Sequence, residues 1–262
     1  MARSQESSSL TLLQITDTHL HAAADTRLRG VNTQRTLLSV LEHARLDSRW
    51  PADAILVTGD IVHDGSRAGY KRFKATLAAF GLPVMCIPGN HDDPKLMQEV
   101  LGEAPFAVGG SIRLDSWSFV LLDSTLAGEE GGGLGVQRRE GLKAALRTEI
   151  GQHVMVCMHH HPIPMGSAYL QSSELRDGPE FLEIIDGYDN VRGVVWGHVH
   201  QASDRQRGKV RFLSTPSTGS QFRPNSAVFA LDDRPPGLRW LKLDPDGTID
   251  TVVDWVETGG GR

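Results

Sequence analysis

The chain has 262 residues, 39% hydrophobic and 23% charged, which is the composition of an ordinary globular protein with room for a sizeable core. Its net charge is −5 and no run of Lys or Arg is long enough to track a nucleic-acid backbone, so we expect no nucleic-acid partner. No apolar run reaches the length of a membrane-spanning helix, and residues 1–9 lack the apolar core of a secretory signal, so we expect no membrane partner.

The first part of the chain alternates short apolar runs with segments of helical period. Residues 1–8 are predicted to form a disordered tail. Strands are predicted at residues 10–15, 54–58 and 82–87, and helices at residues 33–46, 66–80 and 94–101. Asn32 or Thr33 is expected to cap the first helix, with Leu37, Leu38 and Leu41 on one face. The continuous apolar run at 54–58 is typical of a sheet covered on both faces.

The second part begins with a predicted hairpin, residues 111–114 and 117–122, and changes character after about residue 205. Between these points we predict helices at 137–150 and 179–185 and strands at 154–158 and 191–196. The C-terminal part is predicted to be β-rich, with strands at 209–213, 227–231, 238–243 and 248–256. We expect one α/β domain at residues 9–258, in which two packed sheets have flanking helices and the C-terminal strands complete the second sheet.

Acidic, amide and histidine side chains follow the ends of five apolar runs. The five segments are Asp17-Thr18-His19, Gly59-Asp60, Gly89-Asn90-His91-Asp92, His159-His160-His161 and Gly197-His198-Val199-His200. Asp17 and His19 are expected to point the same way because side chains alternate along a strand. Ligands of open α/β sheets bind at the carboxyl edge, so the five segments are candidates for one site.

Histidine is concentrated at these strand ends. Nine of the eleven histidines lie within a few residues of one, and only His43 and His153 fall elsewhere. Imidazole, carboxylate and amide donors without thiolate suit Mn²⁺, Fe or Zn²⁺ better than Ca²⁺. A set of seven ligands is too many for one ion with open positions and fits two ions that share a carboxylate. The seven candidates are Asp17, His19, Asp60, Asn90, one histidine of 159–161, His198 and His200.

In order and spacing these motifs resemble the signature of the calcineurin-like metallophosphoesterases, over residues 10 to about 220. The sequence is most similar to the class III cyclic nucleotide phosphodiesterases of the bacterial 3′,5′-cyclic-AMP type. Further segments that carry the resemblance are residues 13–20, 30–33, 122–124, 158–162, 213–218 and 221–222. The resemblance implies a four-layer α/β/β/α sandwich with two mixed sheets. It also implies hydrolysis of 3′,5′-cyclic AMP to 5′-AMP by attack of a hydroxide held between two divalent ions.

The resemblance also assigns roles to the candidate residues. It places Asp17, His19, Asp60 and His200 on one metal. It places Asp60, Asn90, a histidine of the triple run and His198 on the other. His91 and Asp60 are the catalytic residues it implies, with His91 protonating the departing 3′ oxygen. Substrate contacts are implied for His19, Asp60, Asn90, His91 and His200.

The triple histidine leaves two candidates for one ligand. Counting from the end of the strand gives His159, whereas counting back from Pro162 gives His160. We choose His159, because the register of a strand is fixed more firmly than that of a loop.

Several other residues allow two interpretations. His21 and the pair His63-Asp64 either support the site or are polar residues of loops at its mouth. Asp92 and Asp93 either orient His91 or cap the helix that begins at Pro94. Arg27 and Arg29 either meet a phosphate or are surface arginines, and Asn32 either reaches a base edge or caps a helix. Tyr169 and Phe222 either line a nucleotide pocket or pack in the core. The glycines at 131–133 are expected to form a flexible loop, since the Lys-Ser/Thr of a phosphate-binding loop is absent.

Cys86 and Cys157 are the two cysteines, and both lie in apolar runs. We expect two buried, reduced thiols and a cytoplasmic location. The motifs alone do not separate cyclic AMP from another phosphodiester, a phosphomonoester or a nucleotide, and a non-catalytic scaffold would be expected to have lost ligands. The assembly is expected to be a monomer or a homodimer.

Overall fold

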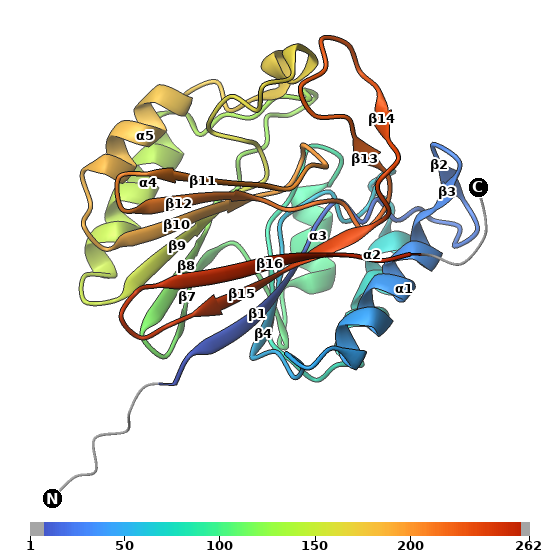
Figure 1. The fold of residues 1–262 in the computed structure, drawn as a ribbon, viewed down its shortest axis with the longest axis horizontal. Coiled ribbons are helices and arrows are strands. Elements are labelled where there is room, and N and C mark those ends of the chain that lie inside the picture. Colours follow the sequence, from blue (N-terminus) through green and yellow to red (C-terminus); the bar gives the residue numbers. More distant parts are fainter. Residues whose placement is uncertain (1–7, 258–262) are drawn as a thin grey trace, which may run out of the picture.

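The computed structural model describes residues 8–257 and has four layers, with two β-sheets face to face and helices on both outer sides (Figure 1). The predicted α/β/β/α sandwich is confirmed. Of the predicted N-terminal tail only Ser8 falls within the described residues, where it is exposed.

The first sheet has six strands. Their order is β16 (Ile249–Trp255), β15 (Gly237–Leu243), β1 (Leu10–Ile15), β4 (Ala54–Val57), β5 (Val84–Cys86) and β6 (Phe106–Val108). Strands β1, β4, β5 and β6 are parallel, and β15 and β16 extend the sheet antiparallel to them. Parallel strands end at the same edge, so the loops after β1, β4 and β5 lie together.

The second sheet also has six strands. Their order is β11 (Ser203–Arg207), β12 (Val210–Ser214), β10 (Val191–Trp196), β9 (His153–Cys157), β8 (Trp117–Leu121) and β7 (Gly110–Leu114). Strands β12, β10, β9 and β8 are parallel, with antiparallel β11 and β7 at the two edges. The loops after β9 and β10 therefore share an edge in the same way.

Alternation along the strands divides the core into three layers. In β1, Leu13 and Ile15 face the helices α1 (Thr33–Leu46), α2 (Arg67–Ala78) and α3 (Pro94–Leu101). Leu10 and Leu12 of the same strand face the second sheet, where they join a cluster that includes Phe119. The outer side of the second sheet packs against α4 (Gly135–Thr148) and α5 (Gly178–Asp186). Each sheet is thus covered on both faces, as the apolar run of β4 indicates.

The helix ends follow the local sequence. Asn32 caps α1, since its side-chain oxygen accepts a hydrogen bond from the Arg35 amide at 2.8 Å, and Ser66 caps α2. The capping interpretation of Asn32 is therefore confirmed. Leu37 and Leu41 are buried as predicted, whereas Leu38 is 49% exposed, so the prediction that it shares their face is wrong.

The main correction concerns the C-terminal strands. Only β11 and β12 belong to the second sheet, whereas β15 pairs with β1 and β16 pairs with β15, so that both enlarge the first. The predicted strand at 227–231 is also wrong, because that segment is a loop that becomes extended only at β14 (Leu231–Asp232), paired with β13 (Gln221–Phe222). Strands β6, β11 and β13 lack a predicted counterpart, as does the small hairpin of β2 (Arg27–Leu28) and β3 (Val31–Asn32).

Two further expectations concern cysteines and membranes. Cys86 and Cys157 are free and buried, as predicted. Within residues 8–257 no helix combines the length and apolarity that crossing a membrane requires.

Replacing Leu241 by Ala tests the layer between the sheets. Leu241 is fully buried there, so the variant is expected to lose about 2–5 kcal/mol of unfolding free energy in urea. Leu46→Ala is the matched control, because Leu46 is 79% exposed and should change stability by less than about 0.5 kcal/mol. Equal losses in the two variants would contradict the proposed packing.

Candidate metal centre

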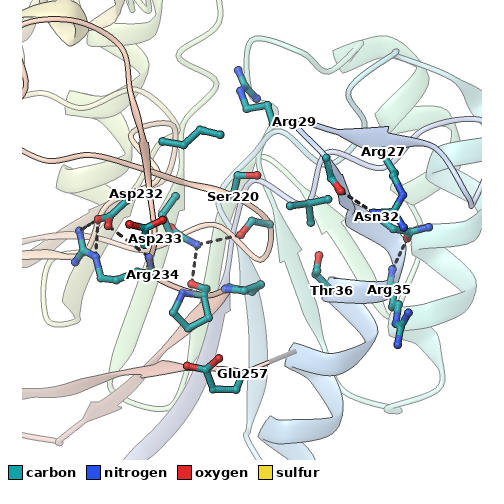
Figure 2. A pocket seen from close by; sticks show the side chains of 17 residues that line it. Arg27, Arg29, Asn32, Arg35, Thr36, Ser220, Asp232, Asp233, Arg234 and Glu257 are labelled. Carbon is teal, nitrogen blue, oxygen red and sulfur yellow. Dashed lines mark hydrogen bonds and ion pairs between the residues drawn. The ribbon is translucent and has the colours of Figure 1, made fainter. Parts of the chain in front are cut away.

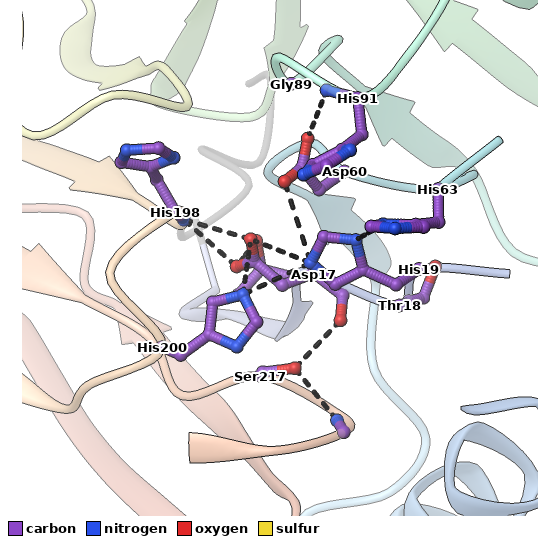
Figure 3. Close-up of polar contacts among 12 residues, drawn as sticks. Asp17, Thr18, His19, Asp60, His63, Gly89, His91, His198, His200 and Ser217 are labelled. Carbon is purple, nitrogen blue, oxygen red and sulfur yellow. Dashed lines mark hydrogen bonds and ion pairs between the residues drawn. The ribbon is translucent and has the colours of Figure 1, made fainter. Parts of the chain in front are cut away.

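All five predicted segments meet where the carboxyl ends of both sheets come together. Asp17 and His19 follow β1, Asp60 follows β4, and Asn90 and His91 follow β5 of the first sheet. The triple histidine follows β9 of the second sheet, and the pair His198 and His200 follows β10. Figure 3 shows Asp17, His19, Asp60, His91, His198 and His200 gathered around one centre.

The backbone at this centre is strained. Five of the eight non-glycine residues with positive φ among residues 8–257 are predicted ligands, with values from 43° to 66°. These five residues are Asp17, His19, Asp60, His198 and His200. The left-handed region is unfavourable for side chains other than glycine and persists where surrounding contacts enforce it. Here Asp17 N–H donates to the Gly59 carbonyl and His19 N–H to the Asp60 carbonyl.

Asp17 and His19 do face the same centre, as predicted, but the predicted cause, alternation along a strand, is wrong. Strand β1 ends at Ile15, before both residues, and left-handed backbone rather than a pleated strand turns the two side chains toward each other.

The first group of donors consists of Asp17, His19, His200 and Asp60. His19 Nε2 lies 3.2 Å from His200 Nε2 and 3.6 Å from Asp60 Oδ2. His200 Nε2 lies 3.3 Å from Asp17 Oδ1. All four residues are at most 3% exposed.

The second group consists of Asp60, Asn90, His159 and His198. His159 Nε2 lies 3.2 Å from Asn90 Oδ1 and 3.5 Å from Asp60 Oδ2, the same carboxylate oxygen that faces His19. The His198 ring centroid is 5.0 Å from that of His159, and its buried Nε2 has no hydrogen-bond partner among the described residues. A buried nitrogen without a partner is costly unless a ligand satisfies it.

Two histidines are oriented by main-chain carbonyls. His159 Nδ1 lies 2.7 Å from the Thr58 carbonyl, and His200 Nδ1 lies 2.7 Å from the Ser220 carbonyl. A carbonyl only accepts, so each Nδ1 carries a proton, and Nε2 is the nitrogen that each ring turns toward the centre and could offer to a metal ion. This is the usual arrangement of metal-bound histidine.

The electrostatics of the centre favour a cation. Burial raises the pKa of Asp60, but neighbouring His159, His19 and His91 outweigh that effect and hold it well below its ordinary range. Burial lowers the pKa of His159, and Asp60 overcomes it and raises the pKa to about 9. Burial lowers the pKa of His19 and His198. The centre thus holds an ionised Asp60 carboxylate beside a protonated His159, and a divalent ion bound there would displace that proton.

The triple histidine separates into three environments. His159 lies between Asp60 and Asn90. His160 Nδ1 is 2.8 Å from the Ser124 hydroxyl, and its ring packs against Gly132, where a Cβ would come within 2.4 Å of it. The His161 ring stacks 5.8 Å from that of His198. The glycine at 132 thus provides space for His160, a role different from the flexible loop predicted at 131–133.

Asp92 and Asp93 have distinct roles. Asp93 caps α3 by accepting from the Lys95 and Leu96 amides. The Asp92 carboxylate instead joins the loops after β4 and β5, since it accepts from the Ile61, Val62 and Gly89 amides at 2.9–3.0 Å and from the Tyr70 hydroxyl at 2.7 Å. Asp92 therefore fixes the loop of Asp60 against the loop of Asn90, which neither predicted role describes.

Three histidines form a row at the rim. His63 stacks on His91 with ring centroids 4.2 Å apart, and its Nδ1 lies 3.2 Å from His19 Nδ1. His21 lies 5.0 Å from His63, ring to ring. His21 and His63 are thus part of the site's wall, while Asp64 accepts from the Ala22 amide and supports the loop.

Sequence reasoning missed the groups that hold the candidate ligands in position. The Thr16 hydroxyl donates to Asp17 Oδ2 at 2.8 Å, and the Ser217 hydroxyl donates to the Asp17 carbonyl at 2.8 Å. Figure 3 shows Ser217 below the ligand pair. The serine in the run 213–218 is a visible sequence signal, whereas the carbonyls of Thr58 and Ser220 have none.

A cavity of about 620 Å³ borders the centre through Ser220 (Figure 2). Arg27 and Arg35 line one side, Asp232 and Arg234 lie on the other, Arg29 is at the upper rim and Glu257 at the bottom. Arg27 donates to the carbonyl of Gly30. The walls of the cavity thus carry both positively and negatively charged side chains.

A four-layer sandwich that collects two carboxylates, an amide and several histidines at the shared carboxyl edge of its sheets defines a metal-dependent phosphoesterase. The chain belongs to the calcineurin-like phosphoesterase family, whose model matches residues 10–202. The family uses divalent metal ions, and the described Asp and His clusters have the donors to hold them.

Relatives agree with this assignment, and a solved structure shares the fold. The chain is 37% identical to the 3′,5′-cyclic adenosine monophosphate phosphodiesterase CpdA of Pseudomonas aeruginosa, over 95% of this chain and 91% of the relative. It is 37% identical to the CpdA of Escherichia coli K12, over 92% and 88%. A dimetal phosphatase from Danio rerio shares the fold with a TM-score of 0.63 at 15% identity, over 95% and 99% of the two chains.

Replacing Asp92 by Asn tests the tie between the loops. The amide NH₂ would face donors that now meet a carboxylate oxygen, so we expect a loss of about 2 kcal/mol in unfolding free energy and a lower metal content. Asp93→Asn is the matched control, because Asn also caps a helix. If Asp92→Asn retains wild-type stability and metal content, the Asp92 hydrogen bonds between the two loops do not position the proposed ligands.

Proposed function

We propose that this protein is a binuclear metal-dependent phosphodiesterase that hydrolyses 3′,5′-cyclic AMP to 5′-AMP. The observation that carries the proposal is Asp60 Oδ2, which faces His19 Nε2 at 3.6 Å and His159 Nε2 at 3.5 Å and so joins two donor groups. The bacterial relatives bear the name of this activity and align along nearly the whole chain, which supports the choice of substrate.

The first ion would be held by Asp17, His19, Asp60 and His200, and the second by Asp60, Asn90, His159 and His198. His159 is preferred to His160 because it lies beside Asp60 and Asn90. Bound there, two ions of Fe, Mn or Zn would neutralise phosphate charge and lower the pKa of a water.

Side chains of the protein would then orient the substrate and donate the proton. An oxygen derived from water adds to phosphorus opposite the 3′ oxygen, the bond from phosphorus to that oxygen breaks, and the leaving oxygen takes a proton. We assign this donation to His91, an assignment supported by its amide, which donates to Asp60 Oδ1 at 2.9 Å, and by its ring, which stacks on His63 at the partly exposed rim. Substrate contacts are proposed for His19, Asp60, Asn90, His91 and His200. We also propose a cytoplasmic location, which the free buried thiols support.

Turnover of cyclic nucleotides tests the function. The Mn²⁺-loaded protein is expected to open 3′,5′-cyclic AMP to 5′-AMP faster than it cleaves 2′,3′-cyclic AMP or p-nitrophenyl phosphate, as measured by product chromatography. Turnover of another ester without any of 3′,5′-cyclic AMP would refute the substrate and leave the reaction class.

Replacing His91 by Ala tests the proton donor. We expect kcat to fall about 10²- to 10⁴-fold with metal content unchanged, since only the proton donor is lost. His43→Ala is the control, because His43 lies on α1 with its side chain 40% exposed, away from the centre. A wild-type kcat in His91→Ala would remove His91 from the mechanism.

Metal removal tests the donor groups. Chelation is expected to abolish activity and lower the melting temperature, because Asp17 and Asp60 would remain buried without their cation. Elemental analysis should show about two ions per chain. Mn²⁺ should restore both readouts and Ca²⁺ should not, given the imidazole-rich donor set. Full activity after complete removal of metal would contradict the proposal.

A further inference from the structure

Aromatic and cationic side chains gather directly outside the metal centre. Four residues, Arg29, Tyr169, Phe222 and Phe229, form what we call the aromatic–arginine surface. It joins the centre through His200, whose ring stacks on that of Phe222 with centroids 4.0 Å apart and planes 4° from parallel.

The four side chains are in contact although they come from distant parts of the chain. The Phe229 ring meets the edge of Phe222 at 5.0 Å and lies 5.8 Å from Tyr169. The guanidinium carbon of Arg29 stands 5.1 Å from the Phe222 centroid and 5.4 Å from that of Phe229. Arg29 comes from the β2–β3 turn, and Figure 2 shows it at the upper rim of the cavity.

The surface is exposed where a core cluster would be covered. Phe229 is 49% exposed, and Arg29 is exposed as well. Leaving a large aromatic ring half in water forfeits burial energy. Exposed rings beside a reactive centre favour a planar ligand, because aromatic faces and guanidinium groups both stack on nucleobases.

We propose that the aromatic–arginine surface binds the purine base of the cyclic nucleotide, with the base lying against Phe229 and Arg29. This inference rests on the proposed function, in which the phosphate lies at the metal centre. His200 belongs to both places, so a nucleotide whose phosphate meets the ligands has its base directed along Phe222 toward Phe229. Recognition through ring faces selects a large base over a small one and depends little on the hydrogen-bonding edge.

The aromatic–arginine surface is separate from the proposed metal ligands. Phe229 contacts Phe222, Tyr169 and Arg29 and none of the seven proposed ligands. A change at Phe229 should therefore weaken substrate binding without displacing a ligand.

Steady-state kinetics of Phe229→Ala test the inference, with 3′,5′-cyclic AMP and the smaller-based 3′,5′-cyclic CMP as substrates. The KM for cyclic AMP is expected to rise about tenfold while kcat stays within about twofold. The preference for cyclic AMP over cyclic CMP should fall, because the purine loses the larger stacking area. Calorimetry with the product 5′-AMP should show the same weakening.

Two controls separate ring stacking from damage to the loop. Val228→Ala changes the neighbouring residue, which is 71% exposed and makes no ring contact, and should behave as wild type. Phe229→Tyr keeps an aromatic face and should restore the KM. Metal content should be unchanged in all three variants.

The outcomes distinguish the two proposals. An unchanged KM in Phe229→Ala, or an equal rise in Val228→Ala, overturns the base-binding role and leaves the phosphodiesterase function. Wild-type protein that binds metal and cleaves other esters but not cyclic nucleotides overturns the proposed function, and the base-binding role with it.

Discussion

The Asp60 carboxylate is the group on which the geometry of the centre depends. Its two oxygens have different tasks. Oδ1 accepts from the His91 amide, which fixes the carboxylate to the loop after β5. Oδ2 faces histidines from both sheets, His19 and His159. One side chain therefore sets the distance between two donor groups that arise from opposite halves of the sandwich.

Two glycines make the approach of these loops possible. A Cβ at Gly89 would lie 2.2 Å from Asp60 Oδ1, and one at Gly59 would lie 2.4 Å from the His159 ring. Gly59 also has φ of +96°, which other residues rarely adopt. The motifs Gly-Asp and Gly-Asn-His-Asp thus combine a donor with the space that the donor needs.

The sequence predicts which residues gather at the centre better than it predicts their geometry. Polar residues at strand ends identified Asp17, Asp60 and His198 as neighbours, because parallel strands share an edge. Alternation gave the wrong reason for Asp17 and His19, since left-handed backbone depends on contacts with the Gly59 and Asp60 carbonyls that no local pattern reveals. The pairing of β15 with β1 was missed for a similar reason. Apolar alternation marks a strand but does not name its partner. A strand is predicted at 227–231 because the run of apolar residues there resembles one, although most of these residues are exposed in the structure.

The order of the ligands along the chain has a consequence for biosynthesis. His19 and His200 are 181 residues apart, and β1 is flanked by β15 from the other end of the chain. A nascent chain emerging from the ribosome first exposes Asp17, Asp60 and Asn90 without the histidines of the second sheet. Contacts between distant segments form late and slowly. The two donor groups are therefore complete only when nearly the whole protein has been made.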